Sequence, residues 1–479
     1  MNYRMIWQVL GRVLSIEAVL LLLPTAVCLI YGESPVHFLI VIAIAGFLGA
    51  LLWHIPVKTR AIYAREGFMI VSLSWVLLSC VGALPFVLGG DIPNYIDAVF
   101  ETVSGFTTTG ASILTDIPAM SRGCMFWRCF THWVGGMGVL VFIMAVLPMS
   151  GEYSMHIMRA EVPGPTVGKL VPRARKTAAI LYLIYVGLTI LEVIFLLFGG
   201  LDLYDALVHS FATAGTGGFS NQANSIGQYD SVYVEMVISV FMLLFGINFN
   251  LFFFLLIGKF SAAFKNEELR WYLGIVAFAT VTMAASIASS VGGFGQGLRY
   301  AFFQVSSIIT TTGFATANFD LWPEYCRALI VLIMFVGACA GSTGGGMKVS
   351  RIMILLRTAR VEIGRLLRPR SVRKVRLEGG SVSSETVHCT LVFSFLYLAI
   401  LVVCTVLLSL NGYDFTTNFT SVLTCLSNVG PGLNLVGPAA NFAFFAPLSK
   451  VLLTLCMLIG RLEIFPMLIL LSPASWKQS

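Results

Sequence analysis

Long apolar runs alternate with short polar segments along the whole chain. About ten runs approach the roughly 20 apolar residues that cross a bilayer as a helix, and they cover approximately 8–30, 37–55, 68–89, 125–149, 176–199, 231–257, 272–291, 327–347, 388–410 and 447–471. No small-residue cleavage site follows the first run, and another run comes directly after it, so we interpret it as a span rather than a signal peptide. The pattern predicts an all-α, polytopic membrane protein.

Four of the polar segments share one sequence pattern. Aligned on a glycine, they read Thr107-Thr108-Thr109-Gly110, Gly215-Thr216-Gly217-Gly218, Thr310-Thr311-Thr312-Gly313 and Ser427-Asn428-Val429-Gly430. The register continues upstream, where Asp97 lies over Asp205. The segments just before the loops, such as 98–106 and 206–214, are too short to span a bilayer and fit re-entrant helices.

The repeated unit is therefore a span, a re-entrant segment, a polar loop and a second span. We expect an N-terminal hairpin at 1–60, which lacks the loop, followed by four pore repeats at 61–158, 159–264, 265–376 and 377–479. Because each unit crosses twice, the units run parallel around an axis normal to the membrane. This predicts a pseudo-fourfold ion pore rather than an inverted-repeat transporter.

The re-entrant helices are expected to end at the centre of the ring. Asp97 and Asp205 are predicted N-caps, whereas Tyr300 and Thr417 at the matching positions are poorer ones. Four helix C-termini that face one point place partial negative charge there and favour a cation. The alternative is that the glycines are packing positions, since small residues are common where membrane helices meet.

A filter built from carbonyl groups fits these loops. Glycine adopts backbone conformations that let successive carbonyls face inward, and such carbonyls replace the water around an ion. The side-chain oxygens two positions before each glycine are expected to add ligands. We assign cation binding to Thr108, Thr109, Gly110, Thr216, Gly217, Gly218, Thr311, Thr312, Gly313, Asn428, Val429 and Gly430.

Composition and charge narrow the class further. The chain is 57% hydrophobic and only 11% charged, which excludes an ordinary soluble protein. Its net charge of +7 comes from bases gathered in alternate loops, most densely in 348–376. By the positive-inside rule these loops and both termini are cytoplasmic, so nucleic acid is not an expected partner, whereas membrane lipid is. The 10 cysteines and 6 histidines lack ligand-like spacing, so no metal cofactor is expected.

The four loops and the additional hairpin resemble the TrkH/KtrB/HKT superfamily of cation-translocating proteins, most closely the TrkH type. The resemblance covers nearly the whole chain. It implies potassium as the transported ion, because a glycine in all four loops is associated with potassium in that family. It also implies a bacterial inner-membrane protein without enzymatic activity. The implied assembly is a homodimer bound to a cytosolic, nucleotide-binding, TrkA-like regulatory subunit that docks on basic segments such as 348–376.

Two further features lie within apolar runs. Three consecutive glycines, Gly344, Gly345 and Gly346, cost about 2–3 kcal/mol in a helix and predict a break. The resemblance implies that this segment is an intramembrane gate; a break without a gating role is the alternative. Arg461 and Glu463 are charges within the last run, spaced so that they do not lie side by side. The resemblance places Arg461 in the permeation path as a barrier, and the alternative is an ion pair with another helix.

Other functions remain open at this point. One is a sodium or mixed sodium and potassium conductor. Another is a membrane-embedded enzyme acting on lipid, for which Glu101, His132, His209 and Glu463 are the candidate residues. We interpret these four as occupying unrelated repeat positions, which argues against an active site. The sequence leaves open whether transport is passive or coupled to protons, as in a symporter.

Overall fold

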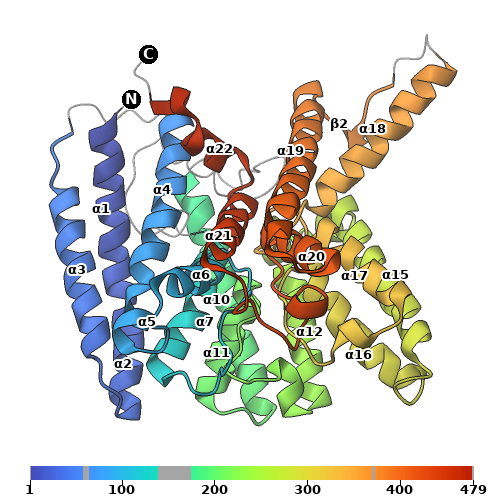
Figure 1. The fold of residues 1–479 in the computed structure, drawn as a ribbon. Helices are drawn as coiled ribbons and strands as arrows, with labels where there is room; N and C mark the ends of the chain where they lie inside the picture. The colour runs from blue at the N-terminus through green and yellow to red at the C-terminus, as the bar shows by residue number, and fades with distance from the viewer. Residues whose placement is uncertain (1, 58–63, 139–173, 369–372, 477–479) are drawn as a thin grey trace.

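The computed structural model describes residues 2–57, 64–138, 174–368 and 373–476. Long helices stand side by side and shorter helices lie between them (Figure 1). The helices are α1 (Tyr3–Leu20), α2 (Leu22–Tyr31), α3 (Val36–Trp53), α4 (Ala64–Gly82), α5 (Leu84–Gly89), α6 (Tyr95–Phe106), α7 (Arg122–Gly136), α10 (Ala174–Phe198), α11 (Leu203–Gly215), α12 (Val232–Phe245), α13 (Phe249–Leu256), α14 (Phe260–Phe264), α15 (Glu267–Ile287), α16 (Phe294–Ile309), α17 (Glu324–Val336), α18 (Val349–Leu367), α19 (Ser384–Leu408), α20 (Phe415–Ser427), α21 (Pro447–Arg461) and α22 (Phe465–Leu471). One antiparallel hairpin, β1 (Arg376–Leu377) and β2 (Gly380–Ser381), follows α18.

The expected all-α membrane fold is confirmed. In the described part of the chain, six helices are long and apolar enough to cross a membrane, or seven if the bent pair α12 and α13 is one span. The two ends of the chain meet, because the Tyr3 hydroxyl donates a hydrogen bond to the Trp476 carbonyl at 2.7 Å. Both termini therefore lie at one end of the helix bundle (Figure 1).

Three of the expected spans are broken near their middle. The break predicted at the glycine run is confirmed, because α17 ends at Val336 and α18 begins at Val349. The runs 231–257 and 447–471, which we expected to be spans, are also interrupted. The first bends by 94° between α12 and α13. The second is interrupted after Arg461, where Glu463 and Ile464 have φ values of 58° and 67°.

The four short helices α6, α11, α16 and α20 occupy the positions expected for the re-entrant segments. Their predicted N-caps are wrong, because α6 and α11 begin earlier than expected. Asn94 caps α6, Asp202 caps α11 and Asp414 caps α20, each accepting a backbone N–H bond. Asp97 and Asp205 lie in the first turns instead, where a negative charge still interacts favourably with the helix dipole.

Some predicted features lie outside the described residues. These are six of the bases in the alternate loops (Lys58, Arg60, Arg159, Lys169, Arg173 and Arg370), the second half of the expected span 125–149, and the repeat boundaries near 60 and 158.

Candidate functional site

The four glycine loops face one another in a closed ring. Each glycine lies against the carbonyl oxygen of the residue that precedes the glycine of the next loop. A Cβ atom added to the glycine would approach that oxygen closely, in the pairs Gly110–Gly217 (2.0 Å), Gly218–Thr312 (2.0 Å), Gly313–Val429 (2.3 Å) and Gly430–Thr109 (2.7 Å). The fourth pair returns to the first loop, so the ring closes in chain order. A side chain at any of the four positions would displace a carbonyl of the ring.

Each short helix enters the ring through the same backbone motif. The residue two before the glycine has a positive φ, namely 53° at Thr108, 56° at Thr216, 61° at Thr311 and 56° at Asn428. The next residue donates its N–H to the carbonyl five positions earlier, at 2.8 Å in three loops and 2.9 Å in the fourth. This is the 6→1 bond of a Schellman motif, which usually has glycine at the left-handed position. The four copies share local geometry as well as sequence.

Threonine or asparagine stands at this left-handed position instead of glycine. The left-handed conformation costs an L-residue roughly 1–2 kcal/mol, and a β-branched threonine is an outlier there. Backbone strain of this kind is typical of functional sites. The strain gives each loop a buried side chain with an oxygen atom just before the glycine.

The four side chains at this position are not equivalent. Thr216 donates to its neighbour, the Gly215 carbonyl, at 2.6 Å. Asn428 donates from Nδ2 to Thr109 Oγ1 at 3.0 Å, which ties the fourth loop to the first. Within the described residues, Thr108 Oγ1 and Asn428 Oδ1 are buried and have no hydrogen-bond partner. These oxygens retain their capacity to accept a bond from, or coordinate, another group.

A cavity of about 250 Å³ opens on one side of the ring. All four glycines of the ring line it, and so does Asp116. The cavity reaches the ring from the side on which Asp116 lies.

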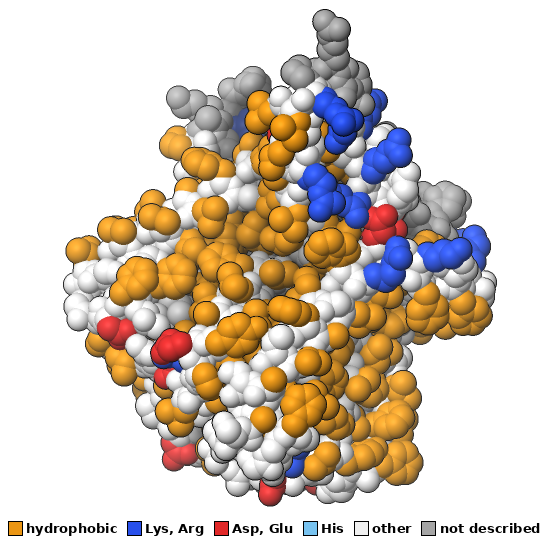
Figure 2. Space-filling view, turned by 90° about the vertical axis from the view of Figure 1, so that its right-hand side faces the viewer, with side chains coloured by type: hydrophobic (Ala, Val, Ile, Leu, Met, Phe, Trp, Pro, Cys, Tyr) orange, Lys and Arg blue, Asp and Glu red, His pale blue; other side chains and the backbone are white. Residues whose placement is uncertain are grey.

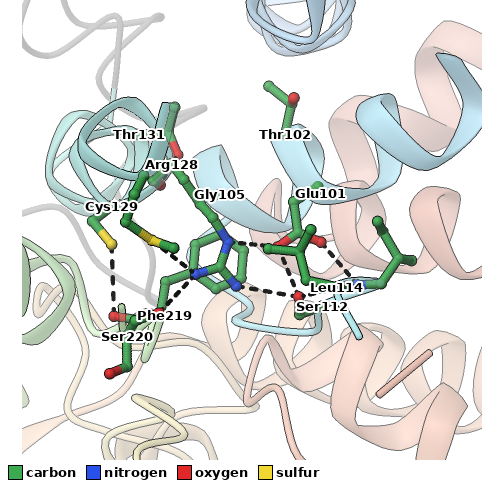
Figure 3. Close-up of polar contacts among 12 residues, drawn as sticks. Glu101, Thr102, Gly105, Ser112, Leu114, Arg128, Cys129, Thr131, Phe219 and Ser220 are labelled. Carbon is green, nitrogen blue, oxygen red and sulfur yellow. Dashed lines mark hydrogen bonds and ion pairs between the residues drawn. The ribbon is translucent and has the colours of Figure 1, made fainter. Parts of the chain in front are cut away.

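Arg128 of α7 lines the same cavity and links the first two loops (Figure 3). It is buried and forms an ion pair with Glu101 of α6, with Nε 2.7 Å from Oε1. Its Nη1 and Nη2 donate to the Ser220 carbonyl at 3.1 Å and to Ser112 Oγ at 3.2 Å. Our sequence reasoning missed this residue, although an arginine inside an apolar run is itself an indication of a specific partner.

Glu101 and His209 serve one structural purpose in two repeats. Each stands nine residues before its loop glycine, and each contacts the serine two residues after it. Glu101 accepts from Ser112 Oγ at 2.9 Å, and His209 Nε2 lies 3.0 Å from Ser220 Oγ. The interpretation of these residues as unrelated in repeat position is therefore wrong. Glu101 and His209 stabilise the loops, since each supplies a hydrogen-bond partner to the serine hydroxyl of its own loop.

The broken segment between α17 and α18 packs directly against the helix ends of the ring. The Gly345 N–H donates to Thr311 Oγ1 at 2.6 Å. A Cβ added to Gly345 would lie 2.3 Å from the Ser427 carbonyl, and one added to Gly344 would lie 2.8 Å from the Thr310 carbonyl. The absence of side chains on these glycines therefore allows the segment to reach the third and fourth loops.

The same segment fills the break between α12 and α13. The Phe249 N–H donates to the Gly341 carbonyl at 3.0 Å, and the Cys339 N–H donates to the Gly246 carbonyl at 3.1 Å. Each break supplies partners for the other, so irregular backbone at membrane depth is hydrogen-bonded within the protein.

Arg461 donates to backbone carbonyls from two other parts of the chain. Its Nη1 lies 2.7 Å from the Thr343 carbonyl, and its Nη2 lies 2.5 Å and 2.7 Å from the carbonyls of Gly135 and Gly136. Glu463 is paired with Arg351 of α18. The prediction that Arg461 and Glu463 do not simply neutralise each other agrees with these contacts.

In the described part of the chain, no three His, Cys, Asp or Glu side chains form a group that could hold a metal ion. An ion at the ring would be held by carbonyl, hydroxyl and amide oxygens, which are typical ligands of hard cations with weak hydration.

Comparisons with known proteins agree on one family. A family model described as a cation transport protein, TrkH, matches residues 35–478. The Trk system potassium uptake protein TrkH of Escherichia coli K12 is 37% identical over 487 residues, covering 100% of both chains. TrkG of the same organism is 32% identical, covering 99% of both. The crystal structure of the potassium transporter TrkH from Vibrio parahaemolyticus superposes with a TM-score of 0.89 at 34% identity, covering 100% of both chains. These matches confirm the resemblance found in the sequence, and this chain belongs to the TrkH family of cation transport proteins.

Proposed function

We propose that this chain takes up potassium across the bacterial inner membrane through the ring of four loops. The observation that carries the proposal is the closed ring of glycine-to-carbonyl approaches. An ion that leaves water needs oxygen ligands on several sides, and a ring of carbonyls supplies them. The filter residues are those assigned from the sequence, with Thr108 and Asn428 contributing oxygens that lack other partners.

The surroundings of the ring favour a cation. Four helix C-termini end at it and place partial negative charge there. The charged residues that line the cavity leading to the ring are Asp116 and Arg128, and Arg128 is paired with Glu101.

The segment containing Gly344, Gly345 and Gly346 acts as a gate in this proposal, and Arg461 holds it closed. Support comes from the bond between the Gly345 N–H and Thr311 and from the bond between Arg461 and the Thr343 carbonyl. A positive charge beneath the ring also opposes the passage of potassium.

The wider assembly follows the family pattern in this proposal. The chain consists of the hairpin and four pore repeats, and the end that carries 348–376 and both termini faces the cytoplasm. Two copies form a homodimer, and a TrkA-like nucleotide-binding subunit docks on the basic segments. Curated relatives are named as members of a Trk system.

Rubidium uptake into proteoliposomes tests the transport proposal. The purified protein is reconstituted, and excess potassium or sodium is added as competitor. We expect potassium to block uptake and sodium to leave it nearly unchanged. Equal block by both ions would replace potassium selectivity with mixed conduction. Absence of uptake, both alone and with the regulatory subunit added, would contradict the proposal.

A further inference from the structure

A groove lies between α15 and α18, near the basic end of the molecule. It has a volume of about 600 Å³, and its lining is Glu267, Arg270, Trp271, Gly274, Ile275, Phe278 and Arg357. The first six residues belong to α15 and recur at the spacing of one helical face. Arg357 comes from α18, which lies in the third repeat.

The chemistry of the groove changes along α15. Its charged residues lie in the first turn, whereas Ile275 and Phe278 lie about two to three turns further on. Phe278 is 62% exposed and Trp271 is 44% exposed. Figure 2 shows Lys and Arg side chains gathered at the upper end of this face of the molecule, above a broad hydrophobic surface. From Glu267 to Phe278 the helix rises about 16 Å, which is close to half of a hydrocarbon core of about 30 Å.

Gly274 leaves the middle of the groove open. No heavy atom lies within 4 Å of a Cβ added at this position. The glycine therefore separates Arg270 and Trp271 from Phe278 by a shallow depression without a side chain. A larger residue would fill that space without disturbing the packing of the protein.

The positive charge at the upper end is only partly neutralised. Arg357 forms an ion pair with Glu267 at 2.7 Å. Arg270 donates instead to the backbone carbonyls of Lys265 at 3.0 Å and Asn266 at 3.4 Å. It has no ion pair with an acidic side chain among the residues that the structure describes. One guanidinium therefore carries uncompensated charge at the border between the polar and the apolar surface.

We infer that this groove binds an anionic phospholipid. The phosphate interacts with Arg270 and the adjacent Arg357, because a guanidinium forms paired hydrogen bonds with phosphate oxygens. One acyl chain lies over Gly274 and Ile275 towards Phe278, and the Trp271 indole lies at headgroup level. A zwitterionic lipid binds less tightly, since its ammonium group lies close to the arginines. Basic pockets between membrane helices are a known way of recognising anionic headgroups.

Native mass spectrometry of the full-length protein in detergent tests this site. The protein is titrated with phosphatidylglycerol or with phosphatidylcholine of the same acyl chains. We expect the wild type to retain phosphatidylglycerol at least about tenfold better. Arg270→Gln should remove most of that preference because it removes the uncompensated charge. Lys374→Gln is the control, since it removes one charge at the same end, outside the groove.

Gly274→Leu is the second variant, and it tests the acyl-chain part of the site. It should weaken the binding of both lipids while leaving the melting temperature unchanged, because the added side chain enters open space. Equal retention of both lipids by the wild type would overturn the inference, as would equal losses in Arg270→Gln and Lys374→Gln. A shift from dimer to monomer in Gly274→Leu, with lipid retention unchanged, would assign the groove to a second copy and also overturn it. The readout requires no ion flux, so it is independent of the transport proposal.

Discussion

At the scale of single residues, the ring could be located from the sequence but its side chains could not be assigned. Four copies of one glycine loop place Gly110, Gly218, Gly313 and Gly430 in register. Such a repeat can be recognised in the sequence without knowing which residues are in contact. The use of Thr311 as an acceptor for the Gly345 N–H depends on a segment 34 residues away in the chain. Arg128 was missed for the same reason, since its partners come from two repeats.

Gly110→Ser is the first prediction at this scale. Its Cβ would lie 2.0 Å from the Gly217 carbonyl oxygen, so the ring must widen or tilt. We expect the ratio of potassium to sodium flux in proteoliposomes to fall about tenfold, equivalent to about 1.4 kcal/mol. Gly412→Ser is the matched control, because Gly412 has a similar φ of 79° and no atom within 4 Å of an added Cβ. An unchanged ratio for Gly110→Ser would remove this loop from the ion path.

Thr311→Val separates the gate from the filter. Valine keeps the shape and the β-branching but removes the acceptor of the Gly345 N–H, a bond worth about 1 kcal/mol. We expect rubidium uptake without the regulatory subunit to rise about fivefold. Thr108→Val is the control for the loss of a filter oxygen, since Thr108 has the same ring position and its hydroxyl has no hydrogen-bond partner in the described residues, and it should not raise uptake. Equal effects of the two substitutions would show that the bond does not hold the segment closed.

At the scale of elements, glycine content indicated one helix break but not the others. The run from Gly344 to Gly346 is unfavourable in any helix, so local propensity was sufficient. The break between α12 and α13 lies between Gly246 and Asn248, whose side chain caps α13, and hydrogen bonds with Gly341 and Cys339 from the third repeat complete it. The N-caps were misplaced because periodicity locates a helix more reliably than its first residue.

The start of α15 connects the hairpin of β1 and β2 to the broken segment. Glu378 Oε1 accepts from the backbone N–H of Glu267 at 2.8 Å and from Asn266 Nδ2 at 2.9 Å. One turn of the same helix provides Glu268, whose Oε1 accepts from the N–H groups of Ala340 and Ser350 at 2.8 Å and 3.0 Å. The hairpin, the helix start and both ends of the broken segment are therefore linked by direct bonds.

Glu378→Ala tests this link. It removes a carboxylate that caps α15, a loss expected to cost about 1 kcal/mol. Amide hydrogen exchange at 266–269 should become about fivefold faster, and exchange at 339–350 should also increase. Glu362→Ala is the control, because Glu362 forms an exposed ion pair with Arg365 within α18. Faster exchange at 266–269 without any change at 339–350 would show that the two regions are not coupled.

At the scale of the whole molecule, the ring is closed by contacts between successive loops, and the broken segment bonds to Thr311 of its own repeat as well as to distant parts of the chain. Each ring glycine faces the next repeat. The broken segment of the third repeat meets the second repeat at Gly246 and the fourth at Ser427. Repeats were predictable from the sequence because they resemble one another. The ring contacts occur at the glycines that the four loops share, whereas the broken segment contacts Gly246 and Ser427, which the repetition does not single out.

Arg461 joins the first, third and fourth repeats, so its replacement tests the molecule as a unit. If Arg461 holds the broken segment closed as a clamp, it acts through its planar guanidinium, which donates to the carbonyls of Thr343, Gly135 and Gly136. If Arg461 is instead a barrier that repels potassium ions, it acts through its charge alone. Lysine keeps the charge but loses the fork. We expect both Arg461→Ala and Arg461→Lys to raise rubidium uptake per folded protein, the alanine variant by about tenfold and the lysine variant by less.

The amount of folded protein is measured by size-exclusion chromatography in parallel with uptake. Arg299→Ala is the control, because Arg299 is paired with Glu235 in the second repeat and makes no bond to the broken segment. It should lower stability without raising uptake. If Arg461→Lys keeps uptake at the wild-type level while Arg461→Ala raises it, the charge restricts flow and the clamp is wrong. If neither variant raises uptake and both lower the yield of folded protein, Arg461 has a structural role only. Its hydrogen bonds to the three carbonyls then stabilise the fold and do not keep the segment closed.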